Sequence, residues 1–250
     1  MDRLFPKEDE IPAAVRLPGP VEQREYLING EFRSWEGPMQ EVLSPLCTAT
    51  PNGPVRPVIG RFPLVTGKEA LEALDAAVRA YDGGRGKWPT MPVAERIHAV
   101  SEFARRVKER RAEVVKLLMW EIGKPLKDSE KEFDRTIEYI DMTIDALKEL
   151  ERLSSRFVIE QGIIGQIRRG PLGVALCMGP YNYPLNETFA TLVPALIMGN
   201  AVVMKPPRHG VLLFSPLMEA FRDSFPPGVM NMLFGEGRKI AAPLMETGQV

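Results

Sequence analysis

The sequence predicts an α/β protein built around an open parallel sheet with helices on its faces. Three successive segments indicate this class: an apolar run from Val174 to Met178, a helical period from Leu185 to Met198, and a second apolar run from Ala201 to Met204. Gly179-Pro180 stops the first run, and Gly199-Asn200 closes the helix. A strand, a helix and a parallel strand form a right-handed crossover. Because continuous apolar runs are typical of strands covered on both faces, we expect the first strand to be buried on both sides.

Near the amino terminus, two segments predict strands. Tyr26 to Phe32 contains Asn29-Gly30, a strong turn signal that predicts a hairpin, and Met39 to Leu43 predicts a further strand. The segment from Ser44 to Pro63 carries five prolines, and we expect it to be an irregular loop. Residues 1–24 are rich in proline and charge, so we expect an arm.

Four helices are expected next. Thr66 is placed to cap the first, whose apolar positions keep a 3.6-residue period. Gly123 and Pro125 stop the third, and an apolar stripe along the fourth predicts that one face is buried. The expected helices run from Thr66 to about Gly83, from Pro92 to Arg110, from Ala112 to Ile122 and from Lys127 to Leu153.

The remaining elements complete the expected fold. Phe157 to Ile159 and Ile163 to Ile167, placed around Gly162, predict a hairpin. Val229 to Phe234 predicts a third strand of the main sheet. A Rossmann-like sheet usually has five or six strands, so we expect this sheet to be incomplete within the chain.

Two polar residues come directly after the two strands of the crossover. Asn182 follows the first strand and Lys205 ends the second. Ligands of open α/β sheets bind outside the carboxyl ends of such strands. We therefore expect Asn182 and Lys205 to lie on the same rim of the sheet and to contribute to a binding site.

The segments GPYNYP and VVMKPP, with the helix between them, resemble the aldehyde dehydrogenase superfamily. The resemblance extends from the hairpin YLINGEF near residue 26 to the last residue, and weaker agreement comes from EIGKP at residues 121 to 125 and from IRRGPLGV. It implies that the Asn182 amide donates to the oxyanion formed from the substrate carbonyl. It also implies that Lys205 binds the adenosine ribose of a nicotinamide cofactor, and that Gly179, Pro180 and Tyr181 contact that cofactor.

In this superfamily a cysteine attacks the aldehyde, hydride passes to the nicotinamide, and water activated by a glutamate hydrolyses the thioester. The resemblance places both residues beyond residue 250, so we expect the chain to be an amino-terminal half. Cys177 lies within an apolar strand and is expected to be a buried, inert thiol, and Cys47 lies in the proline-rich segment. If 250 residues were the whole product, a non-catalytic nucleotide-binding or oligomerisation module would be the alternative.

The implied division of the chain follows these motifs. Residues 1–24 form the arm, and residues 25–153 carry the N-terminal hairpin and the helices of the cofactor domain. Residues 154–169 form a protruding oligomerisation hairpin, and residues 170–250 form the dinucleotide-binding segment. The resemblance thus implies a homo-oligomer, a dimer or a tetramer.

The residues after the second strand favour NADP over NAD. NAD-selective sites normally place a carboxylate near this strand end, whereas MKPPRHG supplies Lys205, Arg208 and His209 and no carboxylate. NAD remains possible, because Arg208 and His209 are also typical of a solvated loop. Gly235 and Gly237 precede a helix and would let the backbone approach the pyrophosphate, although a plain turn has the same pattern.

Two residues point to glyceraldehyde 3-phosphate as the substrate. The branch that oxidises this aldehyde to 3-phosphoglycerate without phosphorylating it binds the phosphate through an arginine and a tyrosine that match Arg135 and Tyr183. A guanidinium suits a phosphate because it gives paired, charge-assisted donors. Alternatives are an ion pair of Arg135 with Glu132 or Glu138, packing of Tyr183 beneath the turn, and another small aldehyde as substrate. This branch usually has a small hydroxyl residue where Arg208 stands.

Composition excludes other classes. The chain has 250 residues, a net charge of −1, 44% apolar and 26% charged residues, as in ordinary globular proteins. Nucleic-acid binding is not expected, because it requires a basic excess on one face. Two cysteines and no secretory signal predict a cytoplasmic protein, and no segment approaches the roughly 20 apolar residues that span a bilayer. We predict no metal site.

Overall fold

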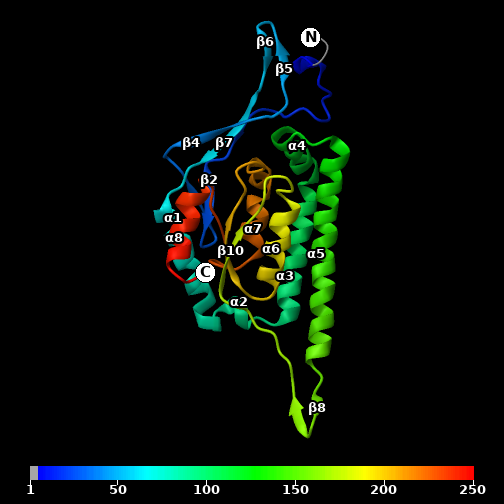
Figure 1. The fold of residues 1–250 in the computed structure, drawn as a ribbon, viewed down its shortest axis with the longest axis vertical. Helices are drawn as coiled ribbons and strands as arrows, with labels where there is room; N and C mark the ends of the chain where they lie inside the picture. The colour runs from blue at the N-terminus through cyan, green and yellow to red at the C-terminus, as the bar shows by residue number, and fades with distance from the viewer. Residues whose placement is uncertain (1–4) are drawn as a thin grey trace.

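A computed structural model describes residues 5–250 (Figure 1). Its main sheet has five strands in the order β10-β11-β12-β2-β3. The strands β10, β11 and β12 are parallel, and β2 and β3 add an antiparallel hairpin to β12. Their bounds are β10 Val174–Met178, β11 Ala201–Lys205, β12 Met230–Met232, β2 Glu25–Ile28 and β3 Glu31–Ser34. The α/β class with a parallel sheet is therefore confirmed.

The first crossover strand is less buried than expected. β10 is an edge strand of the described sheet, and along its length only Cys177 is buried. β11, which lies between β10 and β12, is buried at all five positions. The expectation of full burial was wrong, because helices contact both faces of β10 but no described strand pairs with its outer edge.

Helices cover both faces of the sheet, as Figure 1 shows. α1 and α8 pack together on one face, while α6 and α7 lie on the other with α3, α4 and α5 outside them. All four helices expected before residue 155 are confirmed within two residues of their ends. The bounds are α1 Gly67–Tyr81, α2 Lys87–Thr90, α3 Val93–Glu109, α4 Arg111–Ile122, α5 Leu126–Ser154, α6 Asn186–Ile197, α7 Met218–Ser224 and α8 Gly237–Glu246, with short 3-10 helices η1 Glu8–Glu10, η2 Asp82–Gly84 and η3 Leu212–Leu217.

The helix ends show the expected local chemistry. At the start of α1, the Lys68 N–H donates to Thr66 Oγ1 at 3.2 Å and the Thr66 N–H donates to Glu69 Oε2 at 2.8 Å. This capping box satisfies two backbone donors that the helix itself leaves unpaired. Gly123 ends α4 in the left-handed conformation, with φ of 79°, and its N–H donates to Met119 O.

An aromatic cluster joins the outer helices to the sheet layer. Phe103 of α3 lies 5.7 Å from Phe189 of α6 and 4.8 Å from Phe221 of α7, measured between ring centroids. The buried Trp88 indole N–H donates to Leu196 O at 2.9 Å. Burial of several large rings contributes about 1.5–3 kcal/mol each, so this cluster holds the helical layer against the sheet.

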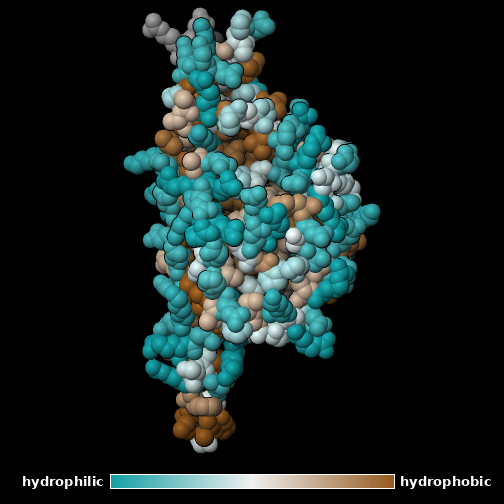
Figure 2. All heavy atoms as spheres, turned by 180° about the vertical axis from the view of Figure 1, so that it is seen from behind, coloured by the Kyte–Doolittle hydropathy of each residue, from teal (hydrophilic) through white to brown (hydrophobic). Residues whose placement is uncertain are grey.

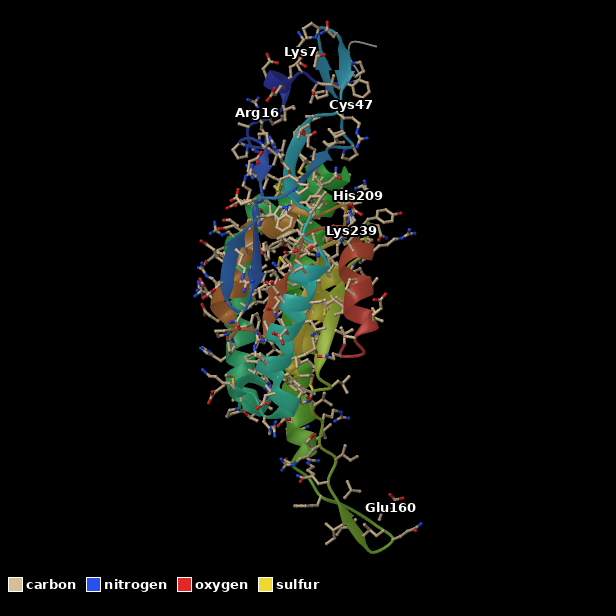
Figure 3. The ribbon with its side chains drawn as sticks, turned by 90° about the vertical axis from the view of Figure 1, so that its left-hand side faces the viewer. Lys7, Arg16, Cys47, Glu160, His209 and Lys239 are labelled. Carbon is tan, nitrogen blue, oxygen red and sulfur yellow. The ribbon has the colours of Figure 1, made fainter. Side chains whose placement is uncertain are left out.

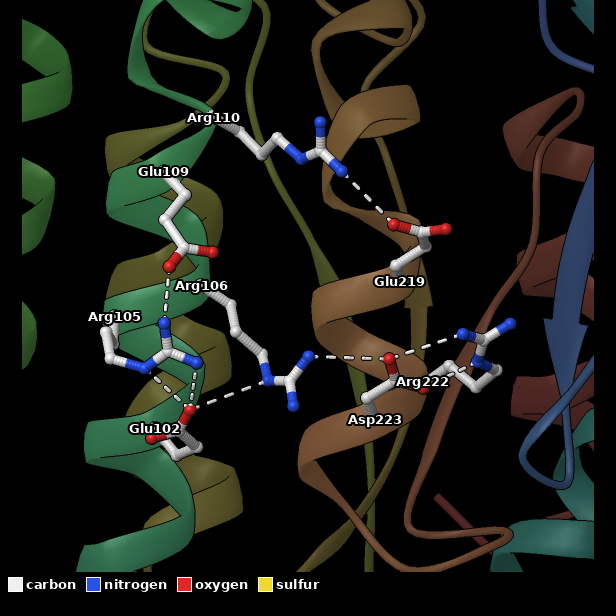
Figure 4. A network of polar contacts seen from close by, with 8 residues as sticks. All are labelled: Glu102, Arg105, Arg106, Glu109, Arg110, Glu219, Arg222 and Asp223. Carbon is white, nitrogen blue, oxygen red and sulfur yellow. Dashed lines mark hydrogen bonds and ion pairs between the residues drawn. The ribbon is translucent and has the colours of Figure 1, made fainter.

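Charged side chains at the surface also connect the α3 side of the helical layer to α7 (Figure 4). Arg110 reaches Glu219 at 3.1 Å, and Arg106 reaches Asp223 at 3.5 Å. All four side chains are at least one-third exposed. Exposed ion pairs contribute at most about 1 kcal/mol, so packing of the aromatic cluster, and not this network, joins α3 to α7.

The segment from Ser44 to Pro63 is more ordered than predicted. It contains a hairpin, β5 Thr48–Thr50 with β6 Gly53–Val55, and a six-residue strand, β7 Val58–Pro63. β7 pairs with β4 Met39–Leu43 on one side and with β1 Val21–Glu22 on the other. The expectation of an irregular loop was wrong, because Ile59 and Phe62 are buried in the core and the flanking prolines fall before β7 and at its last position.

The amino-terminal segment is packed on the molecule from Phe5 onward. β1 pairs in parallel with β7, and a Cβ on Gly60 would lie only 2.5 Å from Val21 O, so the close approach requires glycine. The Trp120 indole N–H donates to Val15 O at 2.7 Å. The expected arm thus contacts the rest of the molecule within residues 5–24; its residues 1–4 lie outside the described residues.

The hairpin of β8 Val158–Glu160 and β9 Ile163–Gly165 projects from one end of the molecule (Figure 1). Figure 2 shows its tip as a hydrophobic patch, and Ile159 and Ile163 are both 72% exposed. The protruding hairpin is confirmed, with a second strand shorter than predicted. Among the helices of residues 5–250, none combines the length and the apolar character that crossing a bilayer requires.

Candidate functional site

Two loops leave the sheet at the same edge. The Cα of Met178, the last residue of β10, is registered with that of Lys205, the last residue of β11. We name residues 179–185 the first rim loop and residues 206–211 the second rim loop. A third, the glycine loop of residues 235–237, follows the adjacent strand β12 by a few residues. The register therefore brings the Asn182 and Lys205 segments to one rim, as the sequence predicts.

The first rim loop is fixed at its ends and exposed in its middle. A Cβ on Gly179 would lie 1.8 Å from Thr188 Oγ1, so glycine is required there, and the Thr188 hydroxyl donates to Pro184 O at 2.5 Å. Asn182 is exposed. Its side chain forms no hydrogen bond with any residue from 5 to 250, so its amide is free to donate outward.

A buried carboxylate from α5 holds the carboxyl end of this loop. Glu132 Oε1 accepts from the Leu185 N–H at 3.1 Å and from the Asn186 N–H at 3.3 Å. Its other oxygen forms an ion pair with Lys124. The Lys124 ammonium also lies 3.9 Å from the ring centroid of Tyr183, a cation–π contact.

A second buried carboxylate holds the second rim loop. Glu121, at the end of α4, accepts from the Val211 N–H at 2.7 Å and from the Leu212 N–H at 2.9 Å. Burial raises the pKa of Glu121 to about 7, although backbone N–H donors oppose the shift. Gly210 of this loop contacts the first rim loop, since a Cβ there would lie 2.3 Å from Pro184 Cβ.

A cavity of about 280 Å³ lies between the second rim loop and the glycine loop. Lys205 is only 7% exposed, and it has no hydrogen-bond or ion-pair partner among the described residues. Burial, followed by repulsion from Arg208, lowers its pKa to about 8. A buried ammonium without an internal partner suits an anionic or hydroxyl-rich ligand. The cavity is lined by Gln40, Phe62, Leu64, Lys205, Arg208, Gly235, Glu236, Gly237 and Arg238.

The residues that line the cavity can be compared with what a dinucleotide requires. Gly235 has φ of 146°, and a Cβ there would approach Val65 O to 3.1 Å. Gly237 begins α8, and a Cβ on it would meet nothing within 4 Å, so open space adjoins the helix start. Helix amino termini bind phosphate through backbone N–H groups and the helix dipole. The glycine loop, α8 and Lys205 therefore fit a phosphate-bearing nucleotide.

One expectation about charge at this cavity was wrong. The sequence after β11 shows no carboxylate, but the fold brings Glu236 to the cavity from the glycine loop. Its carboxylate pairs with Lys239 at 3.0 Å. Arg238 lines the same cavity and was missed by the sequence reasoning, although its position beside Gly237 could have indicated it. The cavity is thus lined by three cationic side chains, Lys205, Arg208 and Arg238, and by one carboxylate, that of Glu236, which is already paired with Lys239.

The other predicted site residues are placed separately. Gly179, Pro180 and Tyr181 do not line this cavity, and Tyr181 is 67% exposed. Tyr183 is 46% exposed, so it does not pack beneath the turn. Arg135 is exposed on α5, one turn after Glu132. It forms no ion pair with Glu132, Glu138 or any other described residue, so the predicted structural alternative is not observed.

Neither cysteine is a suitable nucleophile at the rim. Cys177 is 3% exposed, and burial raises the pKa of its thiol to about 11, which confirms the expectation of an inert thiol. Cys47 precedes β5, and Figure 3 shows it toward the end of the molecule opposite Glu160 of the β8–β9 hairpin.

Comparison with known proteins decides the family. The sequence model for the aldehyde dehydrogenase family matches residues 49–250. The chain belongs to the aldehyde dehydrogenase family. The peroxisomal aminoaldehyde dehydrogenase 1 of Malus domestica is 29% identical over 237 residues, covering 93% of this chain and 45% of that protein. The NADP-dependent glyceraldehyde-3-phosphate dehydrogenase of Zea mays is 30% identical over 226 residues, covering 86% of this chain and 42% of that protein.

Solved structures agree. The crystal structure of NADP-dependent glyceraldehyde-3-phosphate dehydrogenase from Bacillus halodurans, complexed with NADP, matches with a TM-score of 0.75 at 29% identity. The match covers 91% of this chain and 47% of that one. The chain thus spans somewhat less than half the length of these relatives.

Proposed function

We propose that the full-length protein oxidises glyceraldehyde 3-phosphate to 3-phosphoglycerate with NADP, and that this chain supplies the oxyanion donor and the cofactor site. The register of Met178 with Lys205 carries this function, because it brings the exposed Asn182 amide and the buried Lys205 ammonium to one rim. A cysteine and a glutamate outside residues 1–250 would supply the nucleophile and the base. When bound, the nicotinamide would accept hydride from the substrate carbon.

The cavity charges support NADP as the cofactor. Lys205, Arg208 and Arg238 line the cavity, and Glu236, its one lining carboxylate, is paired with Lys239. A 2′-phosphate would be bound there by charge-assisted hydrogen bonds, whereas NAD would leave the cations without a partner. Two of the relatives described above are NADP-dependent, which also supports this choice.

Arg135 and Tyr183 support a phosphorylated substrate. The Arg135 guanidinium is exposed and has no ion-pair partner among the described residues, so it is available to a phosphate. Glu132, one turn earlier on α5, contacts the first rim loop. Tyr183 adds a hydroxyl next to Asn182. A different small aldehyde is the second candidate, because the aminoaldehyde dehydrogenase of Malus domestica is as similar to this chain as the NADP-dependent relatives.

The substrate is tested by comparing kcat/KM for glyceraldehyde 3-phosphate, an aminoaldehyde and propanal in the full-length protein with NADP. We expect glyceraldehyde 3-phosphate to have the highest value by at least about tenfold, the ratio that one phosphate hydrogen bond provides. A higher value for the aminoaldehyde would replace the proposed substrate by the second candidate.

Arg208→Glu in the full-length protein should shift the preference from NADP toward NAD. The new carboxylate would accept the ribose 2′-OH of NAD and repel the 2′-phosphate of NADP. The measurement is the ratio of kcat/KM for the two cofactors, and Arg24→Glu, a substitution at an exposed position outside the cavity, is the matched control. An unchanged ratio in Arg208→Glu would make Arg208 a solvated loop residue.

NADP affinity should fall as pH rises through about 8. Lys205 has a pKa near 8, so it is charged below this pH and neutral above it, and only the charged form attracts the cofactor phosphates. Lys205→Arg should remove the dependence, since a guanidinium stays charged to above pH 12. The measurement is the NADP dissociation constant between pH 7 and 9.5; identical curves for both proteins would contradict the role of Lys205.

The β8–β9 hairpin supports a homo-oligomer. Its exposed side chains include Phe157, Ile159, Ile163 and Ile164, each more than two-thirds exposed. An apolar patch of this kind marks a protein interface, and a second copy of the chain is the proposed partner. The two free cysteines support a cytoplasmic location.

A further inference from the structure

Two glutamates next to the site are buried but have no role in the proposed chemistry. Glu121 is 4% exposed and Glu132 is 2% exposed. They lie on either side of the turn between α4 and α5, which contains Gly123, Lys124 and Pro125. Buried carboxylates are costly unless they are paired or hydrogen-bonded, so their presence here needs an explanation.

The two carboxylates bind the backbones of different rim loops. Glu132 accepts from two successive N–H groups, at Leu185 and Asn186, where the first rim loop enters α6. Glu121 accepts from Val211 and Leu212, where the second rim loop enters η3. An ionised acceptor makes such bonds roughly twice as strong as neutral ones, which applies to Glu132, the partner of Lys124. Glu121 and Glu132, on either side of the turn between α4 and α5, therefore hold both rim loops. We name this pair the Glu121–Glu132 corner.

The loops are also coupled to each other through this corner. Gly210 of the second loop is packed against Pro184 of the first. Ile122, next to Glu121, also lies 3.4 Å from the Cβ position of Gly210. Movement of either loop would break a hydrogen bond to a buried glutamate or create a steric clash between Gly210 and Pro184.

Stability alone does not account for this arrangement. Replacing buried ionic groups by apolar side chains of similar volume is often neutral or stabilising. Glu121 and Glu132, however, place their oxygens at backbone N–H groups within a few residues of Lys205 and Asn182. Displacement of a reacting group by about 1 Å can lower a rate about 100-fold, so precise loop placement has a large catalytic value.

We propose that the Glu121–Glu132 corner is a positioning device that fixes the spacing between Asn182 and Lys205, an inference that rests on the proposed function. Glu132 and its partner Lys124 fix the first rim loop and thereby the oxyanion donor. Glu121 fixes the second rim loop and thereby the cofactor side. Both act through the loops and neither touches the substrate.

The test uses Glu132→Gln and Glu121→Gln in the full-length protein, with Glu138→Gln as a matched control at an exposed position of α5. Glutamine has nearly the same shape but is neutral and has a single acceptor oxygen. At residue 121 its NH₂ would face one of the two loop N–H groups. At residue 132 its NH₂ would face the Lys124 ammonium, and the two loop bonds would lose their charge assistance. We expect Glu132→Gln to lower kcat by about 10- to 100-fold with the KM for NADP within about twofold. We expect Glu121→Gln chiefly to raise the KM for NADP, and Glu138→Gln to change neither value.

Amide hydrogen exchange gives a readout that needs no activity. Glu132→Gln should speed exchange in residues 179–186 and leave residues 206–212 unchanged, and Glu121→Gln should do the reverse. Lys124→Gln, which removes the ion pair but keeps the carboxylate, should accelerate exchange in residues 179–186 to a smaller extent. This milder variant keeps the test decisive if Glu132→Gln does not fold.

Two outcomes are distinguishable. A wild-type protein that oxidises no aldehyde would refute the proposed function, while the exchange data would still report on loop positioning. Equal changes of kcat and KM in both glutamate variants, or exchange that accelerates across the whole chain, would show that the corner has a general structural role. Either of these two results in the glutamate variants would overturn the positioning inference.

Discussion

Asn182→Ala in the full-length protein is expected to lower kcat by about two to three orders of magnitude, with NADP affinity nearly unchanged. The Asn182 amide is exposed at the rim and is free of internal hydrogen bonds among the described residues. A preorganised donor of this kind stabilises the negative charge that develops on the carbonyl oxygen in the transition state. Alanine removes the donor and leaves the loop backbone and its anchor at Glu132 in place.

The measurements are kcat with saturating aldehyde and the dissociation constant of NADP for each variant. Asn186→Ala is the matched control, because the Asn186 amide donates internally to Thr136 Oγ1 at 3.4 Å and is not available to a substrate. We expect this control to change kcat by less than about tenfold. If Asn182→Ala weakens NADP binding as much as it lowers kcat, the assignment of Asn182 as the oxyanion donor is wrong.

Arg135→Leu is expected to weaken use of glyceraldehyde 3-phosphate by about 1.5 to 3 kcal/mol, or about 10- to 150-fold in kcat/KM, and to spare propanal. The guanidinium forms no ion pair within residues 5–250, so its removal leaves no buried partner uncompensated. The contribution of Arg135 to kcat/KM then depends on the substrate phosphate alone. The selectivity between the two aldehydes is the informative quantity.

Lys131→Leu removes a positive charge at an exposed position one turn earlier on α5 and serves as the control for general electrostatics. It should affect the two aldehydes equally and weakly. Equal losses for both aldehydes in Arg135→Leu would leave the family membership unchanged and remove the reason for proposing a phosphorylated substrate.

Local signals predicted much of the fold. Thr66, Asn29-Gly30 and Gly123 determine a helix start, a hairpin turn and a helix end through contacts within a few residues, so the chain shows them without its tertiary structure. The strand β7 was missed because its signal is tertiary. Its prolines suggest a loop, while its pairing with β1 and β4 depends on residues 15 to 39 positions away.

The site was predicted in part for the same reason. Asn182 and Lys205 follow strands of one crossover, so their common rim follows from topology. Glu121 and Glu132 give no such signal, since glutamates on helices are usually solvated, and their partners are 90 and 53 residues away. Arg238 follows Gly237, a position that could have indicated it, but only the fold shows that it lines the same cavity as Lys205.

The most direct measurement is the product formed when the full-length protein is incubated with glyceraldehyde 3-phosphate and NADP in the absence of inorganic phosphate. Phosphorus NMR identifies the product, and the absorbance of reduced nicotinamide gives its amount. We expect 3-phosphoglycerate and NADPH in equal amounts, because water hydrolyses the thioester. No NADPH, or NADPH only when inorganic phosphate is added, would contradict the proposed function.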